Sequence, residues 1–213
     1  MENGLESRLN KLKTDFAKMC RTVEGMLASA NALLVKPDNV AAADVVNKDK
    51  LVDEAEADIE NGCMRLLLRN QPFAKDFRDV SCMLKAITDV ERIGDQAADI
   101  AGLTVSMSEG TDEKAILKMG ALALTMVRDS VNSLLNEDTA LAEKTQALDD
   151  EMDGLFDLAC AGIVEKIKQN PDIAGTAAEL LMIAKYYERI GDHAVNICEW
   201  AEFGNTGIHS KHQ

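Results

Sequence analysis

Apolar residues recur along the start of the chain in alternating steps of four and three. This spacing places them on one face of an α-helix, the pattern of an amphipathic helix whose apolar side packs into a core. The residues of this stripe are Leu5, Leu9, Leu12, Phe16, Met19, Val23, Met26, Ala30 and Leu33. The helix should end near Lys36-Pro37, because proline lacks an amide hydrogen and disfavours helical torsions in the residue before it.

Five more helices are predicted by the same reasoning. The helical stripes are interrupted where proline, glycine, asparagine and aspartate cluster, at 70–72, 108–112, 136–139 and 170–172. We expect a second helix over about 40–70, a third ending near 107, a fourth ending near 136, a fifth over about 139–169 and a sixth over about 173–203. No segment alternates apolar and polar residues at a period of two, so the predicted fold class is all-α.

The pentapeptide Glu-Arg-Ile-Gly-Asp occurs twice, at 91–95 and at 188–192, an offset of 97 residues. The match continues with Ala97 and Ala194, and with Ile100 and Ile197. Such a recurrence in a chain of this length indicates an internal repeat. We therefore predict two tandem three-helix bundles, at 1–107 and 108–204, followed by a polar C-terminal tail at 205–213 that contains His209 and His212.

Charge and composition restrict the classes of partner. With 23 basic and 37 acidic residues the net charge is −14, and aromatic residues make up only 4% of the chain. The negative charge argues against nucleic acid and anionic membranes as partners and favours cations and basic proteins. The scarcity of aromatic residues leaves no stacking platform for bases. No basic pocket for phosphate is apparent.

Cellular location is also constrained by the sequence. There is no apolar run long enough to span a membrane and no signal peptide pattern. The five cysteines, odd in number and without a C-x-x-C spacing, are interpreted as reduced core thiols. We expect a cytoplasmic protein.

Acidic residues recur at helical spacing in both repeats. Glu91 and Asp95 lie one helical turn apart on the same face, as do Glu188 and Asp192. Asp99 extends the first row by a further turn, and Asn196 extends the second. The preceding helices supply Asp49, Asp53, Asp149 and Asp153, which can face these rows across a helix–helix groove. Such oxygen-rich rows suit hard or borderline metal ions.

Two interpretations of these rows remain open from the residues alone. Acid pairs at this spacing are common in so acidic a chain, so the rows could be solvated faces paired with Arg92 and Arg189. Their recurrence with Gly94 and Gly191 inside the helices favours a built feature. Glycine costs about 1 kcal/mol relative to alanine within a helix. It could leave room for an ion, and close helix packing would explain it equally well.

Catalytic motifs are missing from the sequence. No Glu-x-x-His pair, glycine-rich phosphate loop or nucleophile elbow occurs. His193 points about 100° away from Asp192 around the helix, which disfavours it as a ligand beside that residue. The chain is therefore not expected to be an enzyme.

The duplicated Glu-Arg-Ile-Gly-Asp-x-Ala-x-x-Ile motif resembles that of the PhoU family. The resemblance extends over about residues 5–203 and includes Arg69-x-Gln71-Pro72, Asp76-x-Arg78 and Asn196-Ile197-Cys198-Glu199. It implies two tandem three-helix bundles and a cytoplasmic negative regulator of the phosphate-starvation response. It also implies action with the phosphate ABC transporter ATPase and a sensor histidine kinase, and a homodimer.

The resemblance further implies metal ions, iron or zinc among them, at Glu/Asp-x-x-x-Asp motifs. Carried over to this chain, it selects Asp49, Asp53, Glu91, Asp95, Asp149, Asp153, Glu188 and Asp192. The second bundle departs from the pattern, because Thr145 stands where the family pattern has the acid partner of Asp149. The metal site of the second bundle should therefore be poorer in charge or bind a different ion. Gln96 and His193, which follow the two motifs, also differ. The alternative function is a helical metal-binding or buffering protein that has no signalling partner.

Overall fold

The computed structural model describes residues 2–70, 73–107, 111 and 113–208. Every regular element within these ranges is helical, which confirms the all-α fold class. The elements are α1 (Glu2–Val35), α2 (Asn39–Asn70), α3 (Ala74–Thr104), α4 (Lys114–Asn136), α5 (Thr139–Gln146), α6 (Asp149–Gln169), the 3-10 helix η1 (Pro171–Ile173) and α7 (Ala174–Thr206). Most of the predicted turn at 108–112 lies outside the described residues.

Aspartates begin the second helical segment of each repeat. Asp38 Oδ1 accepts hydrogen bonds from the amides of Val40 and Ala41 at 2.9 and 3.0 Å, and Asp138 Oδ1 accepts one from the amide of Leu141 at 3.0 Å. These carboxylates satisfy amides that have no partner within the first helical turn. The local sequence thus fixes where the chain reverses after α1 and after α4.

The predicted fifth helix is divided in the structure. Residues 147–148 separate α5 from α6. The amide of Leu148 bonds to the carbonyl of Thr145 at 3.1 Å, three residues back rather than four, which tightens the turn there. The hydroxyl of Thr145 is also directed to its own helix and donates to the Leu141 carbonyl at 2.8 Å.

Two helix ends differ from the expected boundaries. The third helix ends at Thr104 rather than near 107, since Val105 N–H bonds three residues back to Gly102 O. The last helix continues to Thr206, into the predicted tail, and ends where Gly207 adopts a left-handed φ of 72° that favours glycine. His209 and His212 lie outside the described residues.

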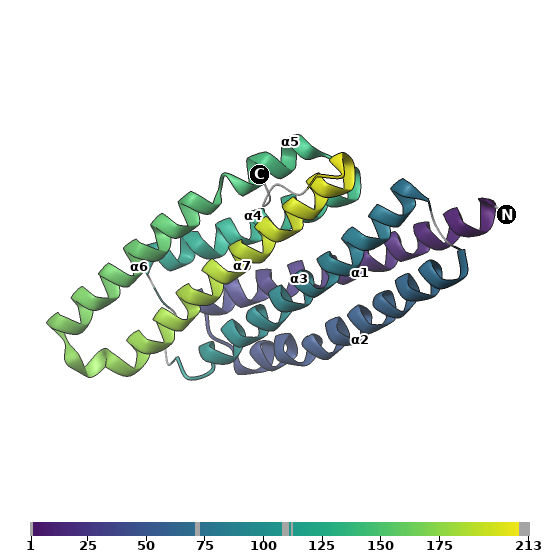
Figure 1. Ribbon diagram of the computed structural model, residues 1–213. Helices are drawn as coiled ribbons and strands as arrows, with labels where there is room; N and C mark the ends of the chain where they lie inside the picture. The colour runs from purple at the N-terminus through teal and green to yellow at the C-terminus, as the bar shows by residue number, and fades with distance from the viewer. Residues whose placement is uncertain (1, 71–72, 108–110, 112, 209–213) are drawn as a thin grey trace.

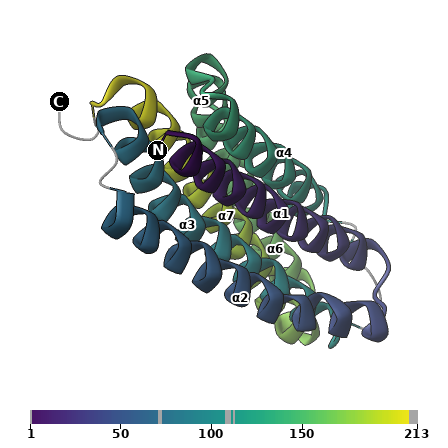
Figure 2. The same cartoon turned by 90° about the vertical axis from the view of Figure 1, so that its right-hand side faces the viewer.

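The helices form two bundles that share one core. Helices α1, α2 and α3 contact one another, and so do α4, α6 and α7, with α5 packed on α4 and α7. The bundles lie side by side through α3 against α7 and α1 against α4 (Figures 1 and 2). Buried side chains of both bundles belong to one continuous apolar cluster, which includes Val23, Met26, Met126 and Ile190. The contact between the repeats is therefore part of the hydrophobic core.

Polar contacts between the repeats come in pairs that the 97-residue offset relates. Asn196 Nδ2 donates to Asp89 Oδ1 at 3.2 Å, which joins α7 to α3. The repeat offset of 97 residues relates Asn196 to Asp99 and Tyr186 to Asp89, so the equivalent contact is between Asp99 and Tyr186. Tyr186 and Asp99 line the same recess, and the pKa of the Tyr186 phenol is raised by burial and then by the charge of Asp99. The repeats therefore meet across an approximate twofold relation.

Candidate metal centre

Helices α2 and α3 bring acidic side chains together as the sequence predicted. Asp49 and Asp53 on α2 lie against Asp95 on α3, and the three can each offer a carboxylate oxygen within 4.8 Å of the others. We call these three residues the first acidic cluster. In the described parts of the chain, no other set of three histidine, cysteine or acidic side chains meets this condition. Oxygen ligands from several carboxylates are what divalent cations such as Mg²⁺, Ca²⁺ or Mn²⁺ require.

Proton affinity in this region is raised by burial and by repulsion among the acids. Burial, followed by the charges of Asp95 and Asp53, raises the pKa of Asp49 to about 6. The pKa of Glu91, one turn before Asp95, rises to about 7, mainly from burial and then from the charges of Asp95 and Glu56. A bound cation would remove the repulsion and favour the ionised carboxylates.

One carboxylate oxygen of the first acidic cluster is buried without a hydrogen bond in the described part of the chain. Asp49 Oδ1 is buried and has no hydrogen-bond partner among the residues that the structure describes. A buried polar atom without a partner is costly, and a metal ion at the cluster would supply one. The residues present therefore fit a bound cation.

The arginine-paired alternative receives less support from the geometry. Arg92 and Arg189 line a recess of about 470 Å³ together with Glu91, Asp95 and Asp99. Among the residues that the structure describes, neither arginine comes within ion-pairing distance of a carboxylate. The two guanidinium groups border the acidic region without neutralising it by direct contact.

The glycines of the repeated motif serve close packing. A Cβ atom on Gly94 would lie 3.3 Å from Val52 Cγ1 and 3.5 Å from Val23 Cγ2. On Gly191 it would lie 3.3 Å from Met152 Cγ and 3.6 Å from Asp149 Oδ1. Of the two explanations left open by the sequence, close helix packing accounts for Gly94, and Gly191 borders both the core and an acidic side chain.

The second acidic cluster consists of Asp149 and Asp153 on α6 with Glu188 and Asp192 on α7. The pKa of Asp149 is raised by burial and then by the charges of Asp153 and Asp192, so these side chains are near one another. Lys185 Nζ lies 2.5 Å from Glu188 Oε2 and neutralises part of this charge. Thr145 is 1% exposed, and its hydroxyl is already bonded within its own helix. One of the four carboxylates of this cluster is therefore already paired, and among the described residues no three of its acids bring their oxygens as close together as the first cluster does.

Asp99 and Asn196, which extend the two rows by one turn, lie at the contact between the repeats. Asp99 faces Tyr186, and Asn196 donates to Asp89, which also lies 2.9 Å from His193 Nδ1. Sequence analysis assigned Asp99 and Asn196 to the metal rows and did not identify Asp89 or Tyr186. The 97-residue offset between these pairs was the signal that could have found them.

Comparison with known proteins agrees with this architecture. The family model described as "PhoU domain" matches residues 16–104 and 116–201, which together cover most of the chain. The chain belongs to the PhoU family. A PhoU homolog of Deinococcus radiodurans, named a phosphate-specific transport system accessory protein, is 30% identical over 97% of this chain and 99% of its own length. A homolog of Aquifex aeolicus with the same name is 32% identical over 98% of this chain and 96% of its own.

Solved PhoU structures have the same fold. The crystal structure of PhoU from Pseudomonas aeruginosa superposes with a TM-score of 0.91 at 26% identity, covering 95% of this chain and 99% of that one. The phosphate transport system regulatory protein PhoU from Streptococcus pneumoniae gives a TM-score of 0.88 at 26% identity, covering 96% of this chain and 98% of that one. PhoU family proteins are accessory and regulatory proteins rather than enzymes, in agreement with the sequence prediction.

None of the helices described in this PhoU family member has the length and apolar character needed to cross a bilayer.

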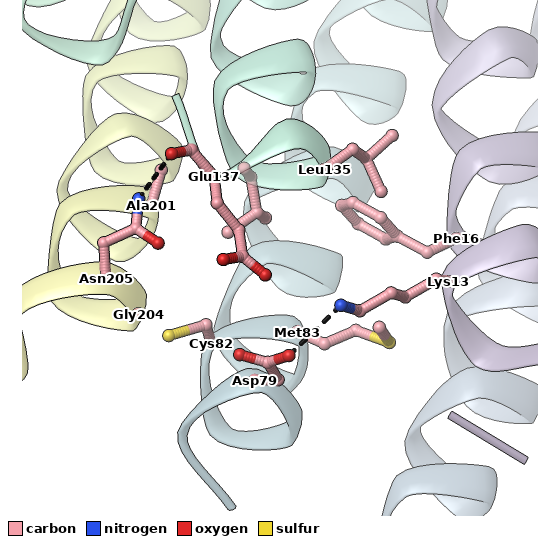
Figure 3. Close-up of a pocket in the computed structure, with 11 residues that line it drawn as sticks. Lys13, Phe16, Asp79, Cys82, Met83, Leu135, Glu137, Ala201, Gly204 and Asn205 are labelled. Carbon is pink, nitrogen blue, oxygen red and sulfur yellow. Dashed lines mark hydrogen bonds and ion pairs between the residues drawn. The ribbon is translucent and has the colours of Figure 1, made fainter. Parts of the chain in front are cut away.

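A small cavity lies at the contact between the repeats, where Phe16, Met83 and Leu135 converge (Figure 3). Its volume of about 30 Å³ has room for about one water molecule. Two interactions border the cavity: Lys13 pairs with Asp79 at 3.1 Å, and Asn205 donates to the carbonyl of Glu137 at 2.8 Å. The cavity is too small for an organic ligand.

The structure contains a basic groove that is not apparent in the sequence. Arg8, Lys11, Arg65 and Arg69 line one groove of about 410 Å³ between α1 and α2. Arg8 and Arg65 are 57 residues apart in the sequence, and only the antiparallel pairing of the two helices brings them together. A search for runs of basic residues could not detect this groove.

Proposed function

We propose that the chain is a cytoplasmic accessory regulator of phosphate transport. In this proposal it represses the phosphate-starvation response by acting with the ATPase of the phosphate ABC transporter and with a sensor histidine kinase. Support comes from the relatives named as accessory proteins of the phosphate-specific transport system, which match this chain over nearly all of both lengths. The observation that carries the proposal is the full two-repeat PhoU architecture.

The metal-binding part of the proposal rests on the first acidic cluster. Asp49, Asp53 and Asp95 would hold a divalent or transition metal ion, with iron and zinc as the ions to test first. The bound ion would neutralise repelling carboxylates and crosslink α2 to α3. Because α3 also packs against α7, occupancy could alter the contact between the repeats and the surface offered to a partner.

The proposal also includes a homodimer that signals through protein contacts. The rival function, a metal buffer that needs no partner, shares the acidic clusters and makes a different prediction about binding. A regulator should retain the transporter ATPase or the kinase on an affinity matrix, whereas a buffer should retain neither.

Two variants separate the metal from the partner. Asp49→Asn with Asp53→Asn removes two carboxylates of the first acidic cluster at little change in shape. Glu54→Gln with Glu60→Gln changes the charge equally at exposed positions on the same helix. Elemental analysis of tag-free protein should show metal in the wild type and the control and less in the first variant. Circular dichroism of all three should show intact helices.

Partner retention is then measured on the same proteins. Retention by the wild type that is reduced in the first variant would support metal-linked regulation. Retention without metal would support the regulator and contradict the metal site. Metal without retention would favour the buffer.

A further inference from the structure

The strongest unassigned feature of the molecule is the groove between the first half of α1 and the second half of α2. We call it the α1–α2 basic groove. Arg8 and Lys11 line it from α1, and Arg65 and Arg69 line it from α2. Asp15 and Asp58 lie farther along the same groove, so its lining carries four cations and two acids. A local excess of two positive charges contrasts with the net charge of −14 for the whole chain.

Three of the four cations that line this groove form no ion pair within the described part of the protein. Among the described residues, Lys11, Arg65 and Arg69 have no carboxylate within ion-pairing distance, although two acids line the same groove. Elsewhere on the surface, lysines such as Lys13, Lys75 and Lys185 do pair with acids. Lys11, Arg65 and Arg69 therefore present positive charge that no carboxylate among the described residues neutralises by direct contact.

A close helix contact forms the floor of the groove. Leu12 and Leu66 are buried, at 7% and 2% exposure. A Cβ atom on Gly62 would lie only 2.5 Å from Leu12 Cδ2, so the glycine lets the side chain of Leu12 lie against α2. The groove therefore has an apolar floor, formed by Leu12 and Leu66, and charged walls. Its volume of about 410 Å³ is within the range of small-ligand sites.

The spacing of the cations indicates the kind of anion. Arg65 and Arg69 lie one turn apart on α2, about 6 Å along the helix axis. Arg8 and Lys11 form a similar pair on the antiparallel α1. Guanidinium groups bind phosphate oxygens in a bidentate manner. Two tiers of cations facing each other suit two linked phosphate groups better than one.

The lining also disfavours a nucleotide. No aromatic side chain lines the groove, so a base would have no surface on which to stack. The carboxylates of Asp15 and Asp58 would repel an anion that extended toward them, which limits the length of the bound chain. We propose that the α1–α2 basic groove binds a short inorganic phosphate chain, with pyrophosphate as its smallest member.

This site is separate from the candidate metal centre. Asp53 and Arg65 are twelve residues apart on one straight helix, about 18 Å along its axis. Anion binding here needs no metal ion, and it can be measured in the presence of a chelator. Its outcome is therefore independent of whether the first acidic cluster holds a cation.

The test is isothermal titration calorimetry of the full chain with pyrophosphate, at neutral pH, fixed ionic strength and with EDTA. Arg65→Gln with Arg69→Gln removes the α2 pair, and Arg8→Gln with Lys11→Gln removes the α1 pair. The matched control is Lys114→Gln with Lys118→Gln, which removes two exposed cations at the same four-residue spacing on α4. Circular dichroism should show the same helicity in every variant, because all these side chains are exposed.

We expect saturable binding of pyrophosphate to the wild type and to the control. Each groove variant should bind about tenfold more weakly or worse, because each loses two charge-assisted contacts. The absence of saturable heat with the wild type would overturn the proposal. An equal loss in the control would also overturn it, because the effect would then reflect net charge alone.

Three further anions test the assignment to a phosphate chain. Inorganic triphosphate should bind at least as tightly as pyrophosphate, and orthophosphate about tenfold more weakly. ATP should bind no more tightly than inorganic triphosphate, since the groove offers nothing to the base. Orthophosphate that bound as tightly as pyrophosphate, or ATP that bound better than triphosphate, would show that the ligand class is wrong.

Discussion

The hydroxyl of Tyr187 on α7 donates a 2.6 Å hydrogen bond to the amide oxygen of Asn31 on α1, across the contact between the two repeats. The amide nitrogen of Asn31 donates in turn to the carbonyl of Gly120 on α4, at 2.8 Å. Tyr187 is fully buried, and burial raises the pKa of its phenol, so the hydroxyl stays a donor. A single asparagine thus ties helices of both repeats together inside the core.

This arrangement predicts a specific cost for Tyr187→Phe. The substitution leaves the amide oxygen of Asn31 without its partner in a partly buried site, and should lower the free energy of unfolding by about 1–3 kcal/mol. Urea denaturation followed by circular dichroism measures this change. An unchanged midpoint would show that the hydrogen bond contributes nothing to the contact between the repeats.

A companion substitution tests the same contact sterically. On Gly120 a Cβ atom would lie 2.8 Å from Asn31 Oδ1, so Gly120→Ala should destabilise the protein. Gly25→Ala is the control, because nothing lies within 4 Å of a Cβ atom at that exposed helical position. The control should be neutral or stabilising by up to about 1 kcal/mol.

Periodicity could predict the helices but not this link. The apolar stripe from Leu5 to Leu33 and the proline after Lys36 are local signals, and α1 follows them closely. Asn31 has no such signal, because its partners are 89 and 156 residues away in the sequence. The sequence also contains no signal for the break before α6. That break is made by a hydrogen bond from the Leu148 amide to the Thr145 carbonyl, and no proline or glycine marks it.

The raised pKa values of Asp49 and Glu91 predict a pH dependence of stability. Their pKa values move from 3.8 to about 6 and from 4.5 to about 7 on folding, so the folded protein binds protons more tightly than the unfolded chain. Stability from these two groups is therefore present at about pH 4 and is lost as the pH rises through 6 and 7. The metal-free wild type should gain more in melting temperature between pH 8 and pH 5 than Asp49→Asn with Glu91→Gln does.

Scanning calorimetry in EDTA at the two pH values makes this measurement. The comparison with the double variant is needed because Asp95, Asp149 and Asp192 also have raised pKa values, whereas Lys75 lowers the pKa of Glu137. Equal pH dependence in the wild type and the double variant would contradict the proposed repulsion of Asp49 and Glu91 by the neighbouring acids. Added metal should reduce the dependence, because a cation competes with protons for the same oxygens.

The composition of the two acidic clusters predicts unequal affinity for metal. Lys185 pairs with Glu188 in the second cluster, and Thr145 supplies a neutral hydroxyl there in place of a carboxylate, whereas Asp49, Asp53 and Asp95 converge in the first. Glu91→Gln with Asp95→Asn should therefore remove more bound metal than Glu188→Gln with Asp192→Asn. Elemental analysis after dialysis against the same metal solution compares them. Greater loss from the second pair of substitutions would reverse this order.

Sequence spacing was sufficient to place the acids of α3 on one face and to expect α2 opposite them. It could not predict which turn of each row meets the other repeat, because that depends on how α3 and α7 are rotated in the bundle. Asp99 and Asn196 continue their rows as regularly as the preceding acids do. Only docking of the repeats directs them toward Tyr186 and Asp89.

Asp89 should be important for the contact between the repeats. Its Oδ1 atom lies 2.9 Å from His193 Nδ1 and 3.2 Å from Asn196 Nδ2, so Asp89→Ala leaves two polar side chains of α7 without this partner. We expect a loss of about 1–3 kcal/mol in the free energy of unfolding. Asn196→Ala and the double variant complete a mutant cycle, in which groups in direct contact show a coupling of about 0.5–3 kcal/mol. Strictly additive effects would mean that the carboxylate and the amide contribute independently, and that this pair does not hold α3 against α7.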